Sequence, residues 1–306
     1  MTRGLARLPV LVAAVLAVIL VLLGLLVFFG PTVPLSQDED PEASAAGPAR
    51  CEEHGISSPD PRADPEPVSG AENEAAGAEG AVQLDQEFTA DGVTSGYHLY
   101  TRDVDFDESV GVVVRLHGDG GAEYADPDGL LNCLAAVAAS HNMMLLAPLT
   151  PDVEGEETWW EDISTNLPWL QDLLSTRVLE TYAPDTEDVW WMGYSGGAEM
   201  ITYGVLPRTP QAVTGGAVMI GGGGSPGALR EEPTAEQRAS LDLTWITGTL
   251  DDGSVPYAPF DALTAAQEGS SWYREQGFEQ VRAEFPEGED HFSLPQARIL
   301  EDVLRQ

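Results

Sequence analysis

The sequence predicts an α/β fold, with a doubly wound, mostly parallel sheet and helices on both faces. Short apolar runs typical of buried parallel strands occur at 112–116, 143–147 and 217–220. Stretches with helical patterning lie between such runs, at 166–182 and 260–276. Because strands and helices alternate in this way from residue 82 to residue 306, we expect one parallel α/β domain.

The most informative motif is Gly193-Tyr194-Ser195-Gly196-Gly197, which lies between an apolar run at 189–192 and a helix-compatible run at 198–203. The pattern predicts a strand, a tight turn with serine at its apex, and a helix. Glycines suit such a turn because its backbone is strained and its neighbours pack closely. The free amides at the start of the next helix favour developing negative charge. Ser195 is therefore the candidate nucleophile.

A second motif supplies candidate hydrogen-bond donors. The strand predicted at 112–116 ends in the small-residue loop His-Gly-Asp-Gly-Gly at 117–121. We expect the amide of Gly196 and that of Asp119 or Gly118 to bind a carbonyl oxygen as it becomes an oxyanion. We expect His117 to fix this loop through a side-chain hydrogen bond.

Candidates for the acid and the base follow the serine in the chain. A strand predicted at 243–248 is followed by Asp251 and Asp252, and a carboxylate there can orient an imidazole. We favour Asp251 and expect the other aspartate to satisfy its own turn. His291 is the only histidine C-terminal to Ser195, so it is the candidate base.

Serine, acid and histidine in this order resemble the α/β-hydrolase superfamily, over roughly residues 82–306. The loop at 117–121, the glycine–serine motif and the final histidine are more narrowly similar to the secreted polyhydroxybutyrate-depolymerase and feruloyl-esterase-like branch. That branch implies an Asp-x-x-Val-Pro spacing, which fits Asp252 rather than Asp251. The sequence therefore leaves the acid open between the two.

The predicted activity is the hydrolysis of carboxylic esters through an acyl-enzyme, with no cofactor. A serine peptidase or amidase of the same fold is one alternative, and a catalytically inactive surface binding module is another. Trp159 and Trp160 follow the strand predicted at 143–147, and we name them as candidates for a substrate-binding wall. The alternative is that they cap the core. The chain offers no Cys/His cluster for a structural zinc ion, so we expect no metal site.

The N-terminal region predicts a membrane tether. Residues 8–29 form an uncharged apolar run long enough to span a bilayer, and Arg3 and Arg7 precede it. We predict a short cytoplasmic segment at 1–7, a transmembrane signal anchor at 8–29 and a catalytic domain outside the cytoplasm. Secretion after signal cleavage is the alternative. Residues 30–81 are acidic and rich in proline and alanine, which predicts a disordered spacer.

Charge and cysteine content bound the partners and the compartment. The formal net charge is −37, and all 14 basic residues are arginine. Such a surface repels polyanions, so we expect no nucleic-acid partner. Cys51 lies in the predicted spacer and Cys133 in a helix predicted at 130–141. A disulfide between them and a free Cys51 with a buried Cys133 both remain open.

Overall fold

The computed structural model describes residues 50–68, 79–153 and 155–306. These residues belong to the compact unit Gly47–Gln306. The predicted cytoplasmic segment at 1–7 and the predicted span at 8–29 lie outside the described residues. Within the described ranges, no helix combines the length and the apolar character needed to cross a membrane.

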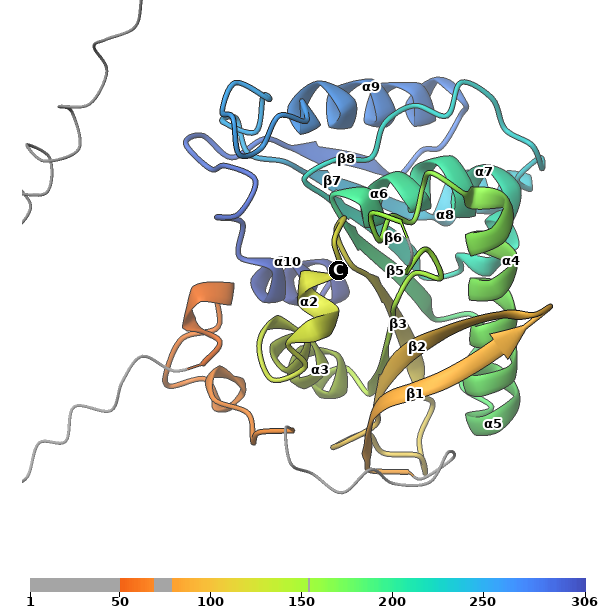
Figure 1. Ribbon diagram of the computed structural model, residues 1–306, viewed down its shortest axis with the longest axis vertical. Helices are drawn as coiled ribbons and strands as arrows, with labels where there is room; N and C mark the ends of the chain where they lie inside the picture. Colours follow the sequence, from red (N-terminus) through yellow and green to blue (C-terminus); the bar gives the residue numbers. More distant parts are fainter. Residues whose placement is uncertain (1–49, 69–78, 154) are drawn as a thin grey trace, which may run out of the picture. The chain divides into compact units, whose positions relative to one another are not determined.

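The centre of the described part of the chain is an eight-stranded sheet with the order β1-β2-β4-β3-β5-β6-β7-β8 (Figure 1). β1 pairs with β2 and β2 pairs with β4 in antiparallel fashion, whereas β4, β3 and β5 to β8 are parallel. The strands are β1 (Val82–Ala90), β2 (Val93–Tyr100), β3 (Gly111–Leu116), β4 (Met143–Pro148), β5 (Val189–Tyr194), β6 (Gly216–Ile220), β7 (Asp242–Ile246) and β8 (Val281–Glu284).

Helices cover both faces of this sheet (Figure 1). One face packs against α3 (Leu130–Ser140) and α10 (Gln296–Leu304), and the other against α4 (Ile163–Leu173), α6 (Gly196–Met200) and α9 (Ala262–Glu275). Shorter helical segments complete the described chain: α2 (Ala122–Ala125), η3 (Leu174–Leu179), α5 (Glu180–Tyr182), η4 (Ile201–Val205), α7 (Leu206–Arg208), η5 (Pro210–Ala212) and α8 (Ala235–Ser240).

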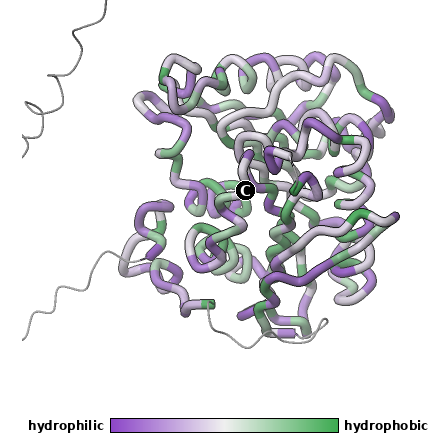
Figure 2. Tube along the Cα trace, in the orientation of Figure 1, coloured by the Kyte–Doolittle hydropathy of each residue, from purple (hydrophilic) through white to green (hydrophobic). Residues whose placement is uncertain are grey.

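Apolar residues line the central strands, as the green stretches in Figure 2 show. Val113 of β3 is buried in the core with α3 and α10, and its neighbour Val114 is buried in the core with α4 and α9. Successive side chains of a strand point to opposite faces, so a strand covered on both sides is mostly apolar. The predicted α/β class and its mostly parallel sheet are confirmed.

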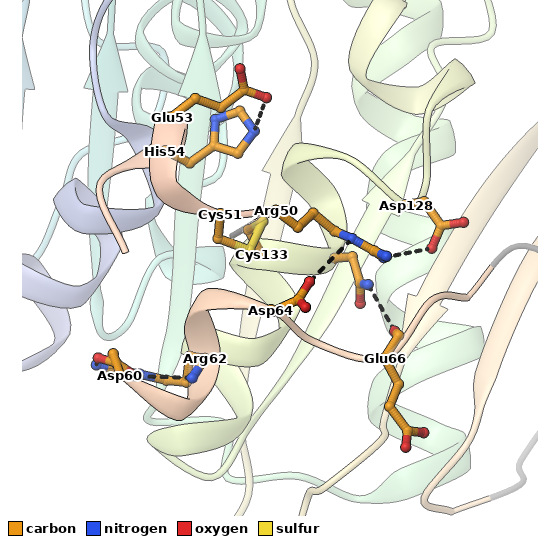
Figure 3. Close-up of a disulfide and its surroundings, with 11 residues drawn as sticks. Arg50, Cys51, Glu53, His54, Asp60, Arg62, Asp64, Glu66, Asp128 and Cys133 are labelled. Atoms are coloured by element: carbon orange, nitrogen blue, oxygen red, sulfur yellow. Dashed lines mark hydrogen bonds and ion pairs between the residues drawn. A yellow bond between two sulfur atoms is a disulfide. The ribbon is translucent and has the colours of Figure 1, made fainter. Parts of the chain in front are cut away.

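The prediction of a disordered spacer at 30–81 requires a correction in its described part, whereas residues 30–49 and 69–78 lie outside the described residues. Residues 50–68 are folded against the domain and contain two short 3-10 helices, Glu52–His54 and Pro61–Ala63. Figure 3 shows the disulfide between Cys51 and Cys133 of α3, with a Cα–Cα distance of 5.6 Å. The buried side chain of Ile56 packs into the same core. The composition predicted disorder because this segment has few apolar residues, but the disulfide and these contacts hold it in place.

Candidate active site

Ser195 occupies the turn between β5 and α6. Its backbone has φ 50° and ψ −119°, an unusual conformation for a residue with a side chain. The turn also packs closely against the loop that follows β3. A Cβ atom on Gly197 would lie 2.5 Å from the carbonyl oxygen of Leu116 and 2.7 Å from that of His117. The glycine is therefore needed for the close approach of two backbones that together form the site.

Three side chains from distant parts of the chain form one hydrogen-bonded series. The Nε2 atom of His291 lies 3.0 Å from the Oγ atom of Ser195, and its Nδ1 atom lies 2.7 Å from Oδ2 of Asp251. The carboxylate accepts a hydrogen bond from the Nδ1–H group, so Nε2 has no proton and can accept the serine hydroxyl proton. The Asp251 side chain is fully buried, and His291 lies in the loop between β8 and α10.

The two candidate acids have different surroundings. Asp252 is exposed, and its carboxylate accepts a hydrogen bond of 3.0 Å from the backbone amide of Ser254. Hydrogen bonds from Ser254 lower the pKa of Asp252 below its usual value. Asp251 alone of the pair contacts His291. The spacing implied by the narrower resemblance favoured Asp252, and the structure does not bring that residue to the imidazole.

His117 fixes the loop after β3, as expected. Its Nε2 atom accepts a hydrogen bond of 3.0 Å from the amide of Thr150, so Nδ1 carries the proton and donates to the carbonyl of Gly118 at 2.7 Å. Burial lowers the pKa of His117 to about 4. The imidazole is therefore neutral at pH 7 and acts as a fixed bridge between two loops.

The backbone amides expected to bind an oxyanion have different partners. The amide of Gly118 faces the carboxylate of Glu123, with Oε2 at 3.3 Å. The amides of Asp119 and Gly196 donate to no acceptor within the described ranges. These two donors remain available beside Ser195, whereas the Gly118 amide is already engaged.

A buried arginine supports the same loop and was not singled out by the sequence. Arg115, near the end of β3, is 1 % exposed. Its Nη2 atom donates to Oε1 of Gln296 at 2.7 Å and to Oε1 of Glu123 at 3.2 Å. The guanidinium thereby connects β3, α2 and α10 beneath the site. Its place within the apolar run of β3 indicates a buried position, but its partners depend on the tertiary fold.

A cleft of about 590 Å³ contains Ser195 and His291. Its lining includes three exposed aromatic residues, Tyr257, Phe260 and Phe292. The sequence analysis missed these three residues. The available signal was their position in the two loops that carry Asp251 and His291.

The tryptophans predicted to form a substrate wall do not line this cleft. Trp159 is fully buried in the core and packs against the His117 ring at a centroid distance of 5.2 Å. Its predicted role in substrate binding is wrong, because its indole ring is covered by protein. Trp160 is partly exposed, and its Nε1 atom donates to Oδ2 of Asp119 at 3.2 Å. Trp160 thus holds a side chain of the cleft in position.

The segment at 50–68 also reaches the cleft. Glu53 and His54, both in the region predicted as a spacer, contribute to its lining. His54 Nε2 lies 3.6 Å from a carboxylate oxygen of Glu53, and burial lowers the pKa of His54. Cys51, one half of the disulfide, therefore lies just before Glu53 and His54, which border the site. In the described part of the chain, no group of three or more His, Cys, Asp or Glu side chains is arranged to hold a metal ion.

The fold is similar to that of a solved esterase structure. No protein-family model and no curated protein matches the chain. A thermostable esterase of known structure is similar at 20% identity and a TM-score of 0.51, over 72% of this chain and 59% of that one. The chain therefore spans about three fifths of that esterase's length.

Two further structures are more distant. A poly(3-hydroxybutyrate) depolymerase from Bordetella parapertussis has 13% identity and a TM-score of 0.49, over 71% of this chain and 88% of that one. A feruloyl esterase module from Clostridium thermocellum has 13% identity and a TM-score of 0.45, over 78% and 92%. With its strand order, its turn at Ser195 and its likeness to the thermostable esterase, the chain has the α/β-hydrolase fold.

Proposed function

We propose that this chain is a serine hydrolase that cleaves carboxylic esters with Ser195 as its nucleophile. The observation that carries the proposal is the hydrogen-bonded series from Asp251 through His291 to Ser195, at 2.7 and 3.0 Å. A serine hydroxyl is a weak nucleophile by itself and requires an adjacent base, which in turn requires an orienting group. The three side chains match these requirements in type, order and distance.

The first half of the proposed reaction forms an acyl-enzyme. The Oγ atom of Ser195 attacks the ester carbonyl carbon while Nε2 of His291 takes the hydroxyl proton. The carbonyl oxygen becomes an oxyanion, which the amides of Gly196 and Asp119 bind. The tetrahedral intermediate then collapses, and the imidazolium gives its proton to the departing alcohol.

The second half releases the acid. His291 takes a proton from water, which attacks the acyl carbon, and the regenerated imidazolium returns a proton to Oγ of Ser195. In both halves, Asp251 holds the imidazole in one tautomer and stabilises its protonated form. Because its carboxylate is buried, the attraction between the two charges is stronger than it would be in water. The proposed steps use only water and residues of this chain.

Covalent labelling tests the nucleophile. The full-length protein is treated with a fluorophosphonate, which reacts with activated serines, and compared with Ser195→Ala and His291→Ala. We expect labelling of the wild type, none of Ser195→Ala and a large loss in His291→Ala. A folded wild type that resists labelling contradicts the proposal and favours the inactive binding module. Labelling with hydrolysis of amides but not of esters favours the peptidase or amidase.

We also propose that the domain works outside the cytoplasm, held by the apolar run at 8–29. The Cys51–Cys133 disulfide supports this location, because disulfides persist in oxidising compartments. The test is protease treatment of intact expressing cells, followed by the intact mass of the purified protein. We expect the protease to digest the domain on intact cells. We also expect the intact mass of the purified protein to include residues 8–29. A protected domain contradicts the location, and a chain that begins after residue 29 indicates a cleaved signal.

A further inference from the structure

The cleft beside Ser195 has an unusual balance of charge. Its lining includes the carboxylates of Glu53, Asp119, Glu123 and Asp126. No arginine is among the described residues that line it, and the chain has no lysine. The titratable bases of the lining are His54 and His291. A bound group therefore meets an excess of negative charge.

Among the described residues, only one of these four carboxylates pairs with an arginine. Glu123 pairs with the buried guanidinium of Arg115 at 3.2 Å. Oδ2 of Asp119, in contrast, accepts from the neutral indole of Trp160. Glu53 has only the imidazole of His54 at 3.6 Å, and burial disfavours the charged form of that imidazole. The excess of negative charge is therefore at Glu53, Asp119 and Asp126.

Asp119 has a position that ordinary ester chemistry does not favour. Its carboxylate occupies the space where a side chain on Gly196 would project, and a Cβ atom there would collide with Oδ1. Gly196 and Asp119 also supply the two amides proposed to bind the oxyanion. An ionised carboxylate so close to a developing oxyanion repels it. A positive charge on the substrate, placed between the two, would remove this repulsion.

Exposed aromatic residues in the lining of the same cleft suit the same kind of group. Tyr257, Phe260 and Phe292 expose aromatic rings, and the Tyr257 and Phe292 ring centroids are 6.3 Å apart. Aromatic faces attract ammonium groups, and quaternary ammonium ions are recognised by such rings together with nearby negative charge. The net charge of −37 further favours the approach of cations over anions.

We infer that the cleft selects esters that carry a fixed positive charge near the scissile carbonyl, with Asp119 as the specificity-determining carboxylate and the exposed rings of Tyr257, Phe260 and Phe292 as the aromatic surface that receives the cation. The substrate class is that of quaternary ammonium or protonated amine esters. This inference rests on the proposed ester hydrolysis at Ser195.

A matched pair of substrates tests the inference with the full-length protein. Acetylthiocholine carries a trimethylammonium group, and 3,3-dimethylbutyl thioacetate has the same shape with carbon in place of nitrogen. We expect kcat/KM to be at least about tenfold higher for the cationic thioester. Equal or faster hydrolysis of the neutral thioester overturns the inference and leaves the proposed function intact. No hydrolysis of either, together with no fluorophosphonate labelling, overturns both.

Variants then assign the preference to residues. Asp119→Asn removes the charge while keeping the shape and the backbone amide, and we expect it to lower the cationic-to-neutral ratio about three- to tenfold. Glu53→Gln removes a largely exposed charge of the lining, which solvent screens, so it is expected to lower the ratio less. Glu236→Gln, an exposed position in α8, is the matched control for loss of one surface charge and is expected to leave the ratio unchanged. A ratio that neither Asp119→Asn nor Glu53→Gln alters contradicts the assignment.

Discussion

The hydroxyl of Tyr194 donates a hydrogen bond of 2.8 Å to the backbone carbonyl of His291. The two rings also pack together, with centroids 5.0 Å apart. Tyr194 is the last residue of β5 and precedes Ser195, so the strand that carries the serine also holds the loop that carries the imidazole. Tyr194, which takes no part in proton transfer, therefore helps Asp251 to fix the position of the base relative to the serine.

Removal of this contact is expected to affect rate more than stability. Tyr194→Phe loses one buried hydrogen bond, which is worth about 1 kcal/mol of unfolding free energy. Because a displaced base reduces catalysis steeply, we expect kcat for ester hydrolysis to fall about tenfold. Tyr100→Phe is the matched control, since its hydroxyl donates to the carbonyl of Pro127 and not to the loop of His291. Equal loss of rate in both variants contradicts this positioning role.

Substitution of the neighbouring residues Asp251 and Asp252 is expected to distinguish the acid that orients His291 from a residue of the turn. Asp251→Asn is expected to lower kcat about 10⁴-fold, because the amide favours the wrong tautomer of His291. Asp252→Asn removes only the charge of an exposed turn residue and keeps an oxygen that can accept the hydrogen bond from the Ser254 amide, so kcat is expected to remain within about twofold of the wild type. Steady-state kinetics on one neutral ester distinguishes the two. A larger loss in Asp252→Asn shows that the acid is misassigned.

The disulfide is expected to contribute strongly to stability. It joins cysteines 82 residues apart, and the chain-entropy model gives about 4.5 kcal/mol for a loop of this length. A variant with serine at both Cys51 and Cys133 is therefore expected to have an unfolding free energy lower by that amount. Its unfolding midpoint is expected at a lower denaturant concentration. The measurement is equilibrium unfolding of this variant and of the oxidised wild type. An unchanged midpoint indicates that residues 50–68 are held by their other contacts alone.

His117 makes stability depend on pH in a defined direction. Its folded-state pKa is about 4, well below the usual 6.5, so the unfolded chain binds the proton first as pH falls. Between pH 6.5 and pH 4 this one group lowers the unfolding free energy by about 3 kcal/mol in total. His117→Gln keeps an acceptor for Thr150 and a donor for Gly118, but does not titrate. Its unfolding free energy is expected to fall less between pH 7 and pH 4.5 than that of the wild type; parallel curves contradict the prediction.

Much of the fold could be predicted because local pattern and tertiary role coincide. β3 contains three consecutive valines, and β4 and β6 also contain continuous apolar runs. Such runs are typical of strands that are covered on both faces. The turn at Ser195 was predictable because strand, glycines and helix follow each other directly in the chain. His291 was predictable by elimination, since no other histidine follows the serine.

Other parts depended on contacts that a linear pattern does not contain. The segment around Cys51 has a composition typical of disorder, and only its partner in α3 shows that it folds. Trp159 follows an apolar strand like a cleft residue, but its loop turns the ring into the core. The rings of Tyr257 and Phe292 meet across two loops separated in sequence, so the aromatic surface exists only in three dimensions.

The most direct test of the account is the location of the acyl group during turnover. The protein is mixed with a p-nitrophenyl ester, quenched in acid while hydrolysis proceeds, and digested for mass spectrometry. If ester hydrolysis proceeds through an acyl-enzyme on Ser195, the peptide that contains Ser195 gains the mass of one acyl group. The Ser195→Ala variant is expected to show neither this adduct nor turnover. Turnover that persists in Ser195→Ala, or an acyl group on another residue with Ser195 unmodified, would contradict this mechanism.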